Sequence, residues 1–374
     1  MSYPASRTRV ISPVLALYAG PFPSTGYLYS SGNSGVNLVN QLQRVQSCTY
    51  GATVPRQFVE QYGQTAPLDQ VIIDAPKVNL DFSYIVADGS NAYNLGFVTD
   101  ATASAFSGLF ALTSDDRNYF LEVVKDGSDA VNNTDPDSTK ICYGIGNGYI
   151  SSFTAEGAVG RFATESFRVE ALNLAVFDGT TGGLATPAIV PASGSRVVGP
   201  TFGLPAAVSG VAGGISAVRP GDIQLSLSQP AFGADVTDIK IQSYNLSANM
   251  NRQDLLKLGS PFPFTKQFNF PMEVSLSVEA ELGASVTGDL SSILCNDVNN
   301  TLVITLYAPG CPGTSKPVQV QYTLVGAKLD TQNFTTALHQ DARVQLNWKA
   351  AIGNGNDQIH ALLYSGSNTP YGQY

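Results

Sequence analysis

Asn249-Met250-Asn251-Arg252-Gln253-Asp254, with the run that continues to Val278, decides how this chain is organised, because a related stretch occurs 196 residues earlier. Nine residues between positions 46 and 82 are identical to their counterparts 196 positions later. In the earlier stretch they are Gln46, Ser47, Ala52, Arg56, Gln57, Gly63, Pro67, Val78 and Leu80. Average composition would give about two or three identities by chance over this length. The sequence therefore predicts two copies of one structural unit rather than one large domain.

The composition indicates an ordered, mainly β chain. Its 374 residues are 43% hydrophobic and only 13% charged, and they include 36 Gly and 21 Pro. Such a chain is too apolar to be disordered and rich enough in turn residues to form many short strands. The net charge of −9, without a run of basic residues, argues against a protein that grips phosphate backbones.

Alternating patterns predict the clearest strands. Apolar residues alternate with polar ones over 274–279, and the same phase recurs over 78–83. A period of two with one polar face predicts an antiparallel sheet that is covered on one side only. Further strands are expected at 14–18, 42–49, 119–124, 141–150, 167–177, 301–307, 318–329 and 342–350.

A short helix is predicted in each copy. Residues 55–62 begin with Pro and are followed by Gly63, which is the usual asymmetry of helix ends. In the second copy, Asn251 is a candidate N-cap for a helix at 254–258 that ends before Gly259. A Pro-containing connector follows each predicted helix.

The repeat predicts the domain limits. We expect an N-terminal arm at 1–40, a first domain at 41–178, a Gly- and Pro-rich linker at 179–220, a second domain at 221–352 and a C-terminal arm at 353–374. Inserts at 91–114 and 126–137 distinguish the first copy, and 283–299 is their shorter counterpart. In the last strands the match rests on Leu172-Asn173-Leu174 against Leu346-Asn347-Trp348.

No catalytic residue, cofactor or metal site is predicted. His339 and His360 have no nearby Cys or carboxylate pattern of a triad or a zinc site. The acidic residues within 126–137 could approach a calcium ion, but they lack EF-hand spacing, so a solvated loop is favoured. Four cysteines without a CxxC pair favour free thiols. The apolar run after Arg9 is interrupted by Pro13, so we expect neither a cleaved signal nor a membrane span.

The pairs Arg56-Gln57 and Arg252-Gln253 recur at the same place in both copies. Two roles fit them equally. The guanidinium could hold the short helix on the sheet through hydrogen bonds, or it could bridge to a carboxylate or backbone carbonyl of the next unit. Together with Asn251 and Trp348 they are the candidate subunit-interface residues, although a single Trp is more often part of a core.

Three segments of the second copy resemble the tail tube proteins of tailed bacteriophages. They are Ser243–Gln253, Phe270–Val278 and Tyr322–Phe334. The resemblance covers residues 238–352 directly and residues 42–178 by way of the repeat. It implies two tandem tail-tube-like β-barrel or sandwich domains, each flanked by a short α-helix, plus extended arms.

The resemblance also implies a function, a location and partners. Subunits of this family join edge to edge into rings, and the rings stack into the conduit for genome ejection in the virion tail, after assembly in the host cytoplasm. The implied partners are further copies of this chain, a tape measure protein, tail completion proteins and, in a contractile tail, a sheath protein. Double-stranded DNA passes without specific binding. Because each chain carries two units, we expect a ring of three chains, with a hexamer of two-layered subunits as the alternative.

A virion-associated module that binds a carbohydrate or a receptor is the alternative function. The aromatic residues of the first insert discriminate between the two hypotheses. Tyr93, Phe97, Phe106 and Phe110 would line an exposed groove in a sugar-binding module, and would lie buried at a seam in a tube. An enzyme is not expected, because no pair of carboxylates stands out.

Overall fold

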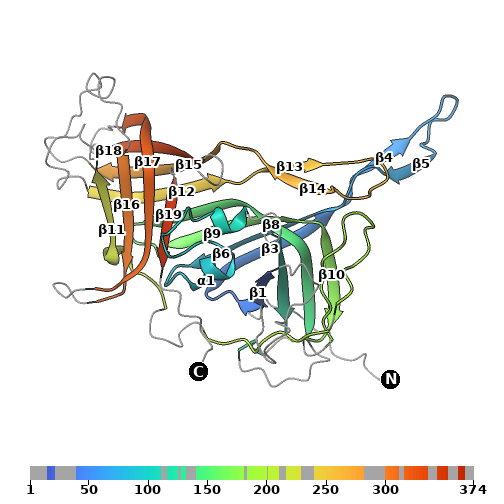
Figure 1. Ribbon diagram of the computed structural model, residues 1–374, viewed down its shortest axis with the longest axis horizontal. Coiled ribbons are helices and arrows are strands. Elements are labelled where there is room, and N and C mark those ends of the chain that lie inside the picture. Colours follow the sequence, from blue (N-terminus) through green and yellow to red (C-terminus); the bar gives the residue numbers. More distant parts are fainter. Residues whose placement is uncertain are drawn as a thin grey trace, which may run out of the picture.

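The computed structural model shows a mainly β protein built on antiparallel pairing (Figure 1). It describes residues 15–21, 39–110, 116–124, 128–131, 140–180, 183–199, 201–209, 216–228, 240–281, 300–310, 316–335, 343–352 and 361–366. Fifteen strands belong to one connected sheet, and four more form two separate hairpins. The mainly β class predicted from the composition is confirmed.

The first copy extends from β1 to β10. Its elements are β1 (Leu15–Pro21), β2 (Asn40–Gln41), β3 (Val45–Thr53), β4 (Arg56–Val59), β5 (Asp69–Ile72), β6 (Lys77–Ile85), α1 (Ser90–Asn94), a 3-10 turn (Ser107–Leu109), β7 (Arg117–Val123), β8 (Ile141–Ala158), β9 (Thr164–Ala171) and β10 (Asn173–Asp178).

The second copy begins with a 3-10 turn (Pro220–Asp222). Its strands are β11 (Ile223–Ser228), β12 (Lys240–Asn249), β13 (Arg252–Leu255), β14 (Thr265–Phe268), β15 (Met272–Glu281), β16 (Asn300–Tyr307), β17 (Val318–Thr335), β18 (Arg343–Ile352) and β19 (Leu362–Gly366).

The strand register repeats at the offset that the sequence predicts. Ala52 of β3 lies opposite Val78 of β6, and 196 residues later Ala248 of β12 lies opposite Val274 of β15. Each of these two strand pairs has an irregularity at the same place, in β3 between positions 45 and 47 and in β12 between 241 and 243. Because a one-residue slip would turn every side chain to the wrong face, this agreement identifies β3 and β6 as the counterparts of β12 and β15.

The last strands repeat at a different offset from the one suggested by sequence. Val78 lies opposite Ala171 of β9, whereas Val274 lies opposite Ala350 of β18. The sequence offset between β9 and β18 is therefore 179 residues. The bulge in β8 between 150 and 152 recurs in β17 between 329 and 331 at the same offset. The predicted match of Leu172-Asn173-Leu174 with Leu346-Asn347-Trp348 is therefore wrong, since Trp348 corresponds to Val169.

In each copy one long strand takes part in two layers. The first half of β8 pairs with β7 and β10, and its second half pairs with β9. In the second copy, β17 pairs first with β16 and β19 and then with β18. In Figure 1 the strands β11, β16 and β17 cross β12, β15 and β18 steeply.

The predicted short helices are wrong. Residues 56–59 and 252–255 are strands β4 and β13, and they pair with β5 and β14 to form two hairpins in the same register. Gly63 and Gly259 have positive φ values of 89° and 84°, and both lie in the loop that joins the two strands of their hairpin. Glycine at positive φ serves a hairpin loop as well as a helix end, so the signal did not distinguish them.

Parts of the predicted arms and linker belong to the folded body. β1, within the stretch expected to be an arm, pairs along its length with β7, and β19 pairs with β17. In the linker, Leu184 and Phe202 are buried and pair with each other through their backbones. None of the helices in the described part of the chain has the length and apolar character needed to cross a bilayer.

One apolar core runs through both copies. Trp348, the only Trp of the chain, is fully buried in it on β18. The opposite face of β3, β6, β9, β12, β15 and β18 is polar. On this face Ser47 is bonded to Ser83 in the first copy, and Ser247 is bonded to Ser275 in the second. On this face Arg343 pairs with Glu279. Trp348 therefore belongs to the core and is not an interface residue.

We predict that Trp348→Ala lowers the free energy of unfolding by about 3–5 kcal/mol, because it leaves a cavity in the shared core. Urea denaturation of the monomeric chain measures the change. Phe334→Ala, on an exposed part of β17, is the control and should change it by less than about 0.5 kcal/mol. Equal losses for the two variants would contradict the placement of Trp348.

Candidate assembly interface

The two copies join edge to edge inside one chain. β12 of the second copy lies along the second half of β8, from Ser243 opposite Ala158 to Asn249 opposite Ser152. We call the sheet that this pairing makes continuous, which contains β3, β6, β9, the second half of β8, β12, β15 and β18, the shared sheet. Beyond the strand ends, the N–H of Val159 donates to the carbonyl of Gln242 at 2.9 Å. We call this pairing and the contacts beside it the internal joint.

Gly157 admits an aromatic ring into the internal joint. It lies opposite Tyr244, and a Cβ at position 157 would stand only 2.6 Å from the tyrosine ring. Tyr244 is buried and belongs to the common core. A larger residue at 157 would therefore force the two strands apart.

Hairpin β13–β14 extends the internal joint to the middle of β8, where its pairing with the end of β9 begins. The guanidinium of Arg252 stacks on Tyr149 of the first copy at 4.6 Å and on Phe268 of its own hairpin at 4.1 Å. It also donates a hydrogen bond to the carbonyl of Leu109 at 3.4 Å. Two roles were considered for this arginine. Its contact with Phe268 is local support, and its contacts with Tyr149 and Leu109 bridge to the first copy.

The ring of Tyr149 receives a second cation. The Nζ of Lys266 lies 3.7 Å from the ring centroid, and the tyrosine hydroxyl donates to Glu170 at 2.9 Å. Burial lowers the pKa of Lys266 to about 8, against the opposing effect of Asp254. A partly desolvated cation over an aromatic ring contributes more than an exposed one, so this contact ties the hairpin firmly to the first copy.

A buried carboxylate joins the two copies near the core. Glu165 of β9 accepts hydrogen bonds from Tyr84 of the first copy and from Tyr322 and Tyr364 of the second. Burial raises the pKa of Glu165, and the three hydroxyl donors act in the opposite direction. The corresponding residue of β18 is Val344, so this cluster occurs at the internal joint and is not repeated by the duplication.

The first insert fills the seam between the copies. The N–H groups of Ala101 and Ala105 donate to the carbonyls of Tyr364 and Leu362 in β19, at 3.0 and 2.8 Å. Phe97 and Phe106 are buried against Phe153. Phe110 packs at 4.7 Å on Phe268, and Tyr93 is exposed. The aromatic residues of the insert therefore do not form an exposed groove.

Two strand edges equivalent to the internal joint have no neighbouring strand in the described part of the chain. β3, the counterpart of β12, pairs only with β6. Residues 331–335 of β17, the counterpart of the joint-forming half of β8, pair only with β18. Phe334 is 54% exposed, whereas its counterpart Ala155 is fully buried in the internal joint. Within the described ranges, one such joint is thus formed, and the two edges equivalent to its halves are unpaired.

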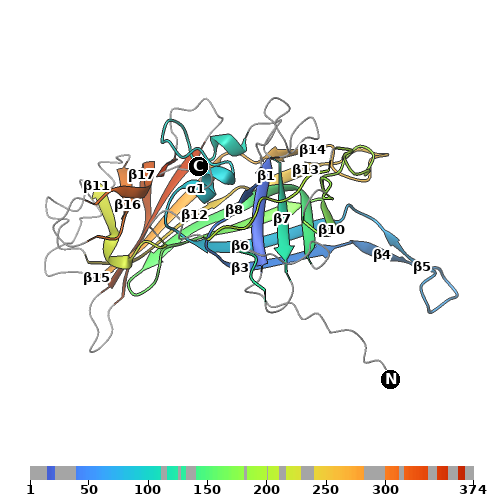
Figure 2. The ribbon, with the colours of Figure 1, turned by 90° about the horizontal axis from the view of Figure 1, so that it is seen from below.

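The hairpin of the first copy is exposed. In Figure 1 and Figure 2, β4 and β5 project beyond the rest of the molecule, while β13 and β14 lie along it. Arg56 and Gln57 are exposed at the base of β4. Gln253 and Asn251 are also exposed, in hairpin β13–β14 and just before it. Of the six candidate residues, Arg252 contacts the other copy, and Trp348 lies in the core.

Other predicted features give no alternative site. His339, His360 and the acidic residues Asp135 and Asp137 lie outside the described residues. Cys48 and Cys142 are free thiols, and burial raises the pKa of each to about 12. In the described ranges no group of three His, Cys, Asp or Glu side chains is arranged to hold a metal ion.

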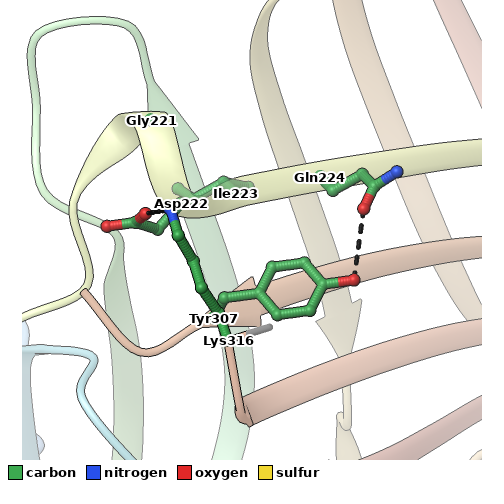
Figure 3. Close-up of a pocket in the computed structure, with 6 residues that line it drawn as sticks. All are labelled: Gly221, Asp222, Ile223, Gln224, Tyr307 and Lys316. Carbon is green, nitrogen blue, oxygen red and sulfur yellow. Dashed lines mark hydrogen bonds and ion pairs between the residues drawn. The ribbon is translucent and has the colours of Figure 1, made fainter. Parts of the chain in front are cut away.

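A surface pocket of about 360 Å³ lies beside the 3-10 turn at the start of the second copy (Figure 3). Its buried carboxylate, Asp222, pairs with Arg219 at 2.7 Å and with Lys316. These partners lower the pKa of Asp222. The hydroxyl of Tyr307 donates to Gln224 at 3.1 Å. The charged groups of the pocket pair with one another, and the arrangement fits a role in fixing the turn before β11.

We predict that Glu165→Gln removes a pH dependence of stability. Because burial raises the pKa of Glu165 above its ordinary value of 4.5, its contribution to stability is complete below that pH. The contribution is lost as the pH rises through the folded-state pKa. The free energy of unfolding of the wild type, measured with urea from about pH 5 to about pH 8, should therefore fall relative to that of the variant.

The control is Glu156→Gln. Glu156 is an exposed carboxylate on the polar face of the sheet, and it accepts a hydrogen bond from Thr164 at 3.2 Å. Its stability should keep the pH profile of the wild type. Glu165→Ala should be less stable than Glu165→Gln at all pH values, because it leaves buried tyrosine hydroxyls without their acceptor. Parallel profiles for the wild type and Glu165→Gln would rule out the buried carboxylate as the source.

A search of protein-family models finds no match for this chain, and no curated protein is significantly similar to it in sequence. The function of the candidate interface is therefore inferred from the repeat and from the contacts of the internal joint.

Proposed function

We propose that this chain is a structural virion protein, the tail tube subunit of a tailed bacteriophage, which closes into rings that stack into the conduit for genome ejection. The observation that carries the proposal is the internal joint. The two halves of the pairing of β12 with β8 are repeated at β3 and at residues 331–335 of β17, where the described part of the chain supplies no strand to complete them. A second chain can supply the missing partner at each end.

The offsets of the repeat specify the register between chains. Asn249 opposite Ser152 in the internal joint corresponds to Thr53 of one chain opposite Thr331 of the next. In the same way Gly51 lies opposite Asn333, and Tyr50 lies opposite Phe334. The contact is head to tail, which gives a closed ring when the rotation per unit divides a full turn. Closure also removes exposed sheet edges, which otherwise promote aggregation.

Three chains per ring fit this arrangement. The two copies lie side by side in one continuous sheet, so each chain contributes two neighbouring sectors to the same ring. This geometry favours a trimer with six units over a hexamer whose subunits each span two layers. The shared sheet would then form the inner wall.

The polar face of the shared sheet suits a passage for DNA. It carries hydroxyl pairs such as Ser247 with Ser275, and its basic residues face carboxylates, as Arg343 faces Glu279 and Glu281. Unpaired clusters of Lys and Arg would hold phosphate groups, whereas a neutral and acidic surface repels them. In this proposal, the tape measure protein occupies the tube during assembly, and completion proteins and, in a contractile tail, a sheath protein contact it from outside.

The carbohydrate- or receptor-binding alternative is disfavoured by the aromatic residues of the first insert. Phe97 and Phe106 are part of the core, and Phe110 packs against the hairpin of the second copy. An aromatic platform for a sugar would have to be exposed. Among the four residues, Tyr93 alone is exposed.

We predict that Gly51→Cys combined with Asn333→Cys gives a disulfide between chains. The two side chains are expected directly opposite each other on the polar face, and a Cβ at Gly51 meets nothing within 4 Å in the single chain. After assembly and mild oxidation, non-reducing gel electrophoresis should show species of two and three chains and no larger ones. Negative-stain electron microscopy of the same sample should show rings with a central channel.

Each single variant, which retains the native cysteines, serves as the control and should give no ladder. A pair shifted by two residues, Gly51→Cys with Thr331→Cys, should cross-link poorly because the two positions are farther apart across the strands. A ladder that extends to six chains would replace the trimer with a hexamer. A monomeric wild type without rings or cross-links would refute the tube function, and glycan binding would then be tested.

A further inference from the structure

We infer that hairpin β4–β5 is a docking arm for a second copy of this chain, and that Arg56 of the arm binds Asp330 of the chain on which it lies. This inference rests on the proposed function, because it names the partner surface of the same interface. It goes beyond pairing of strand edges, since the edges could pair without the arm.

The hairpin of the second copy provides the template. β13–β14 reaches the middle of β8, where its pairing with the end of β9 begins, and there Arg252 stacks on Tyr149 and Phe110 packs on Phe268. The hairpin of the first copy has the same register, with Arg56 opposite Ile72 just as Arg252 is opposite Phe268. In the single chain, β4–β5 does not lie on a surface equivalent to that of β8 and β9 under β13–β14.

The exposed surface of β4–β5 requires a partner. Its large apolar residues are all exposed, namely Phe58, Val59, Tyr62, Leu68, Val71 and Ile72. A patch of this kind on a soluble protein marks an interaction site. The equivalent hairpin packs on a copy of the same unit through Arg252 and Phe268, although Leu258 and Phe264 near its tip are exposed. The occupant that this template indicates for β4–β5 is therefore the second copy of a neighbouring chain.

The repeat places Arg56 over the point in the middle of β17 where its pairing with β18 begins. The counterparts of Tyr149 and Glu170 there are Lys328 and Lys349, which lie opposite each other across the two strands. A third cation at this place would be repelled unless an acid were present. Asp330, the counterpart of Ser151 in the bulge, supplies the carboxylate, 3.0 Å from the Nζ of Lys349. The pair of Tyr149 and Glu170 in the internal joint is thus replaced by Lys328, Lys349 and Asp330. In this cluster Asp330 can pair with Arg56.

The tip of the arm also has an expected position. In the internal joint, residues 256–261 at the tip of β13–β14 and residues 72–75 at the base of β4–β5 line one pocket. The equivalent contact between chains brings residues 60–65 to residues 268–271 of the neighbour. Tyr62, fully exposed in the single chain, would then meet Phe270, which is also exposed. The six hairpins of a three-chain ring would follow one another head to tail around it.

A double-mutant cycle on Arg56 and Asp330 tests the inference. We expect Arg56→Ala and Asp330→Ala each to raise the concentration at which half of the chains are assembled, by roughly tenfold, as close interfacial charge pairs do. The double variant should be no weaker than the more affected single variant, because the same contact is lost. Mass photometry over a dilution series measures the three values.

Arg161→Ala is the matched control, since Arg161 is an exposed arginine in the β8–β9 turn, away from the proposed contact between chains. It should leave assembly unchanged. A photo-cross-linking residue at Tyr62 should label residues 268–271 of another chain, and the same residue at the exposed Tyr93 should not label that segment.

The outcomes separate the arm from the proposed function. If the cysteine pair at 51 and 333 cross-links while Arg56→Ala assembles like the wild type and Tyr62 labels no other chain, the docking arm is refuted and the ring stands. If the effects of the two alanine substitutions simply add, Asp330 is not the partner of Arg56. If neither rings nor cross-links form, the proposed function fails and the arm with it.

Discussion

The pairing of β12 with β8 is the contact on which the rest of the structure depends. A sheet edge exposes a row of backbone N–H and C=O groups that need a partner. In a chain of two equivalent units, only one such edge pair can be satisfied internally, and it is satisfied between the second half of β8 and β12. Among the strands that the structure describes, the edges of β3 and of residues 331–335 of β17 remain unpaired. Their complementarity follows from the duplication itself.

The joint inside the chain and the proposed joint between chains differ in chemistry for a physical reason. The internal joint forms once, during folding, so it can contain the buried Glu165 with its three tyrosine donors, a cluster that is costly to desolvate. The open edges must remain soluble until they meet. The edge of β17 carries polar and charged residues such as Asn333 and Asp330 beside the exposed Phe334, while hairpin β4–β5 carries a larger group of exposed apolar residues. The position equivalent to Glu165 is Val344, and that of Tyr149 is Lys328.

The sequence predicted what depends on side-chain period and missed what depends on tertiary contacts. The alternation over 78–83 and 274–279 located β6 and β15 and their common offset, because one face of each strand is buried. The hairpins were predicted as helices because Pro55 and Gly63 fit either structure, although Phe58 and Val59 suit a strand better. The predicted match of Trp348 with Leu174 is wrong because two identical residues in a run of three do not define a strand register. The role of Arg252 was among the alternatives, but its partner Tyr149 could not be found without the fold.

Whether such a chain forms a ring or an open fibre depends on the two joints together. A head-to-tail contact closes only if the rotations around one circuit sum to a full turn. In the proposed ring of three chains, the internal joint is fixed by folding, so the joint between chains would have to supply the remainder of one-third of a turn. The bulge in β17 between 329 and 331 repeats the bulge of β8, and a bulge increases the local twist of its strand. Because both joints begin at the same bulge, each would rotate its neighbour by a similar angle. Retention of this irregularity in both copies, in spite of their different side chains, is what a closed ring of equal sectors requires.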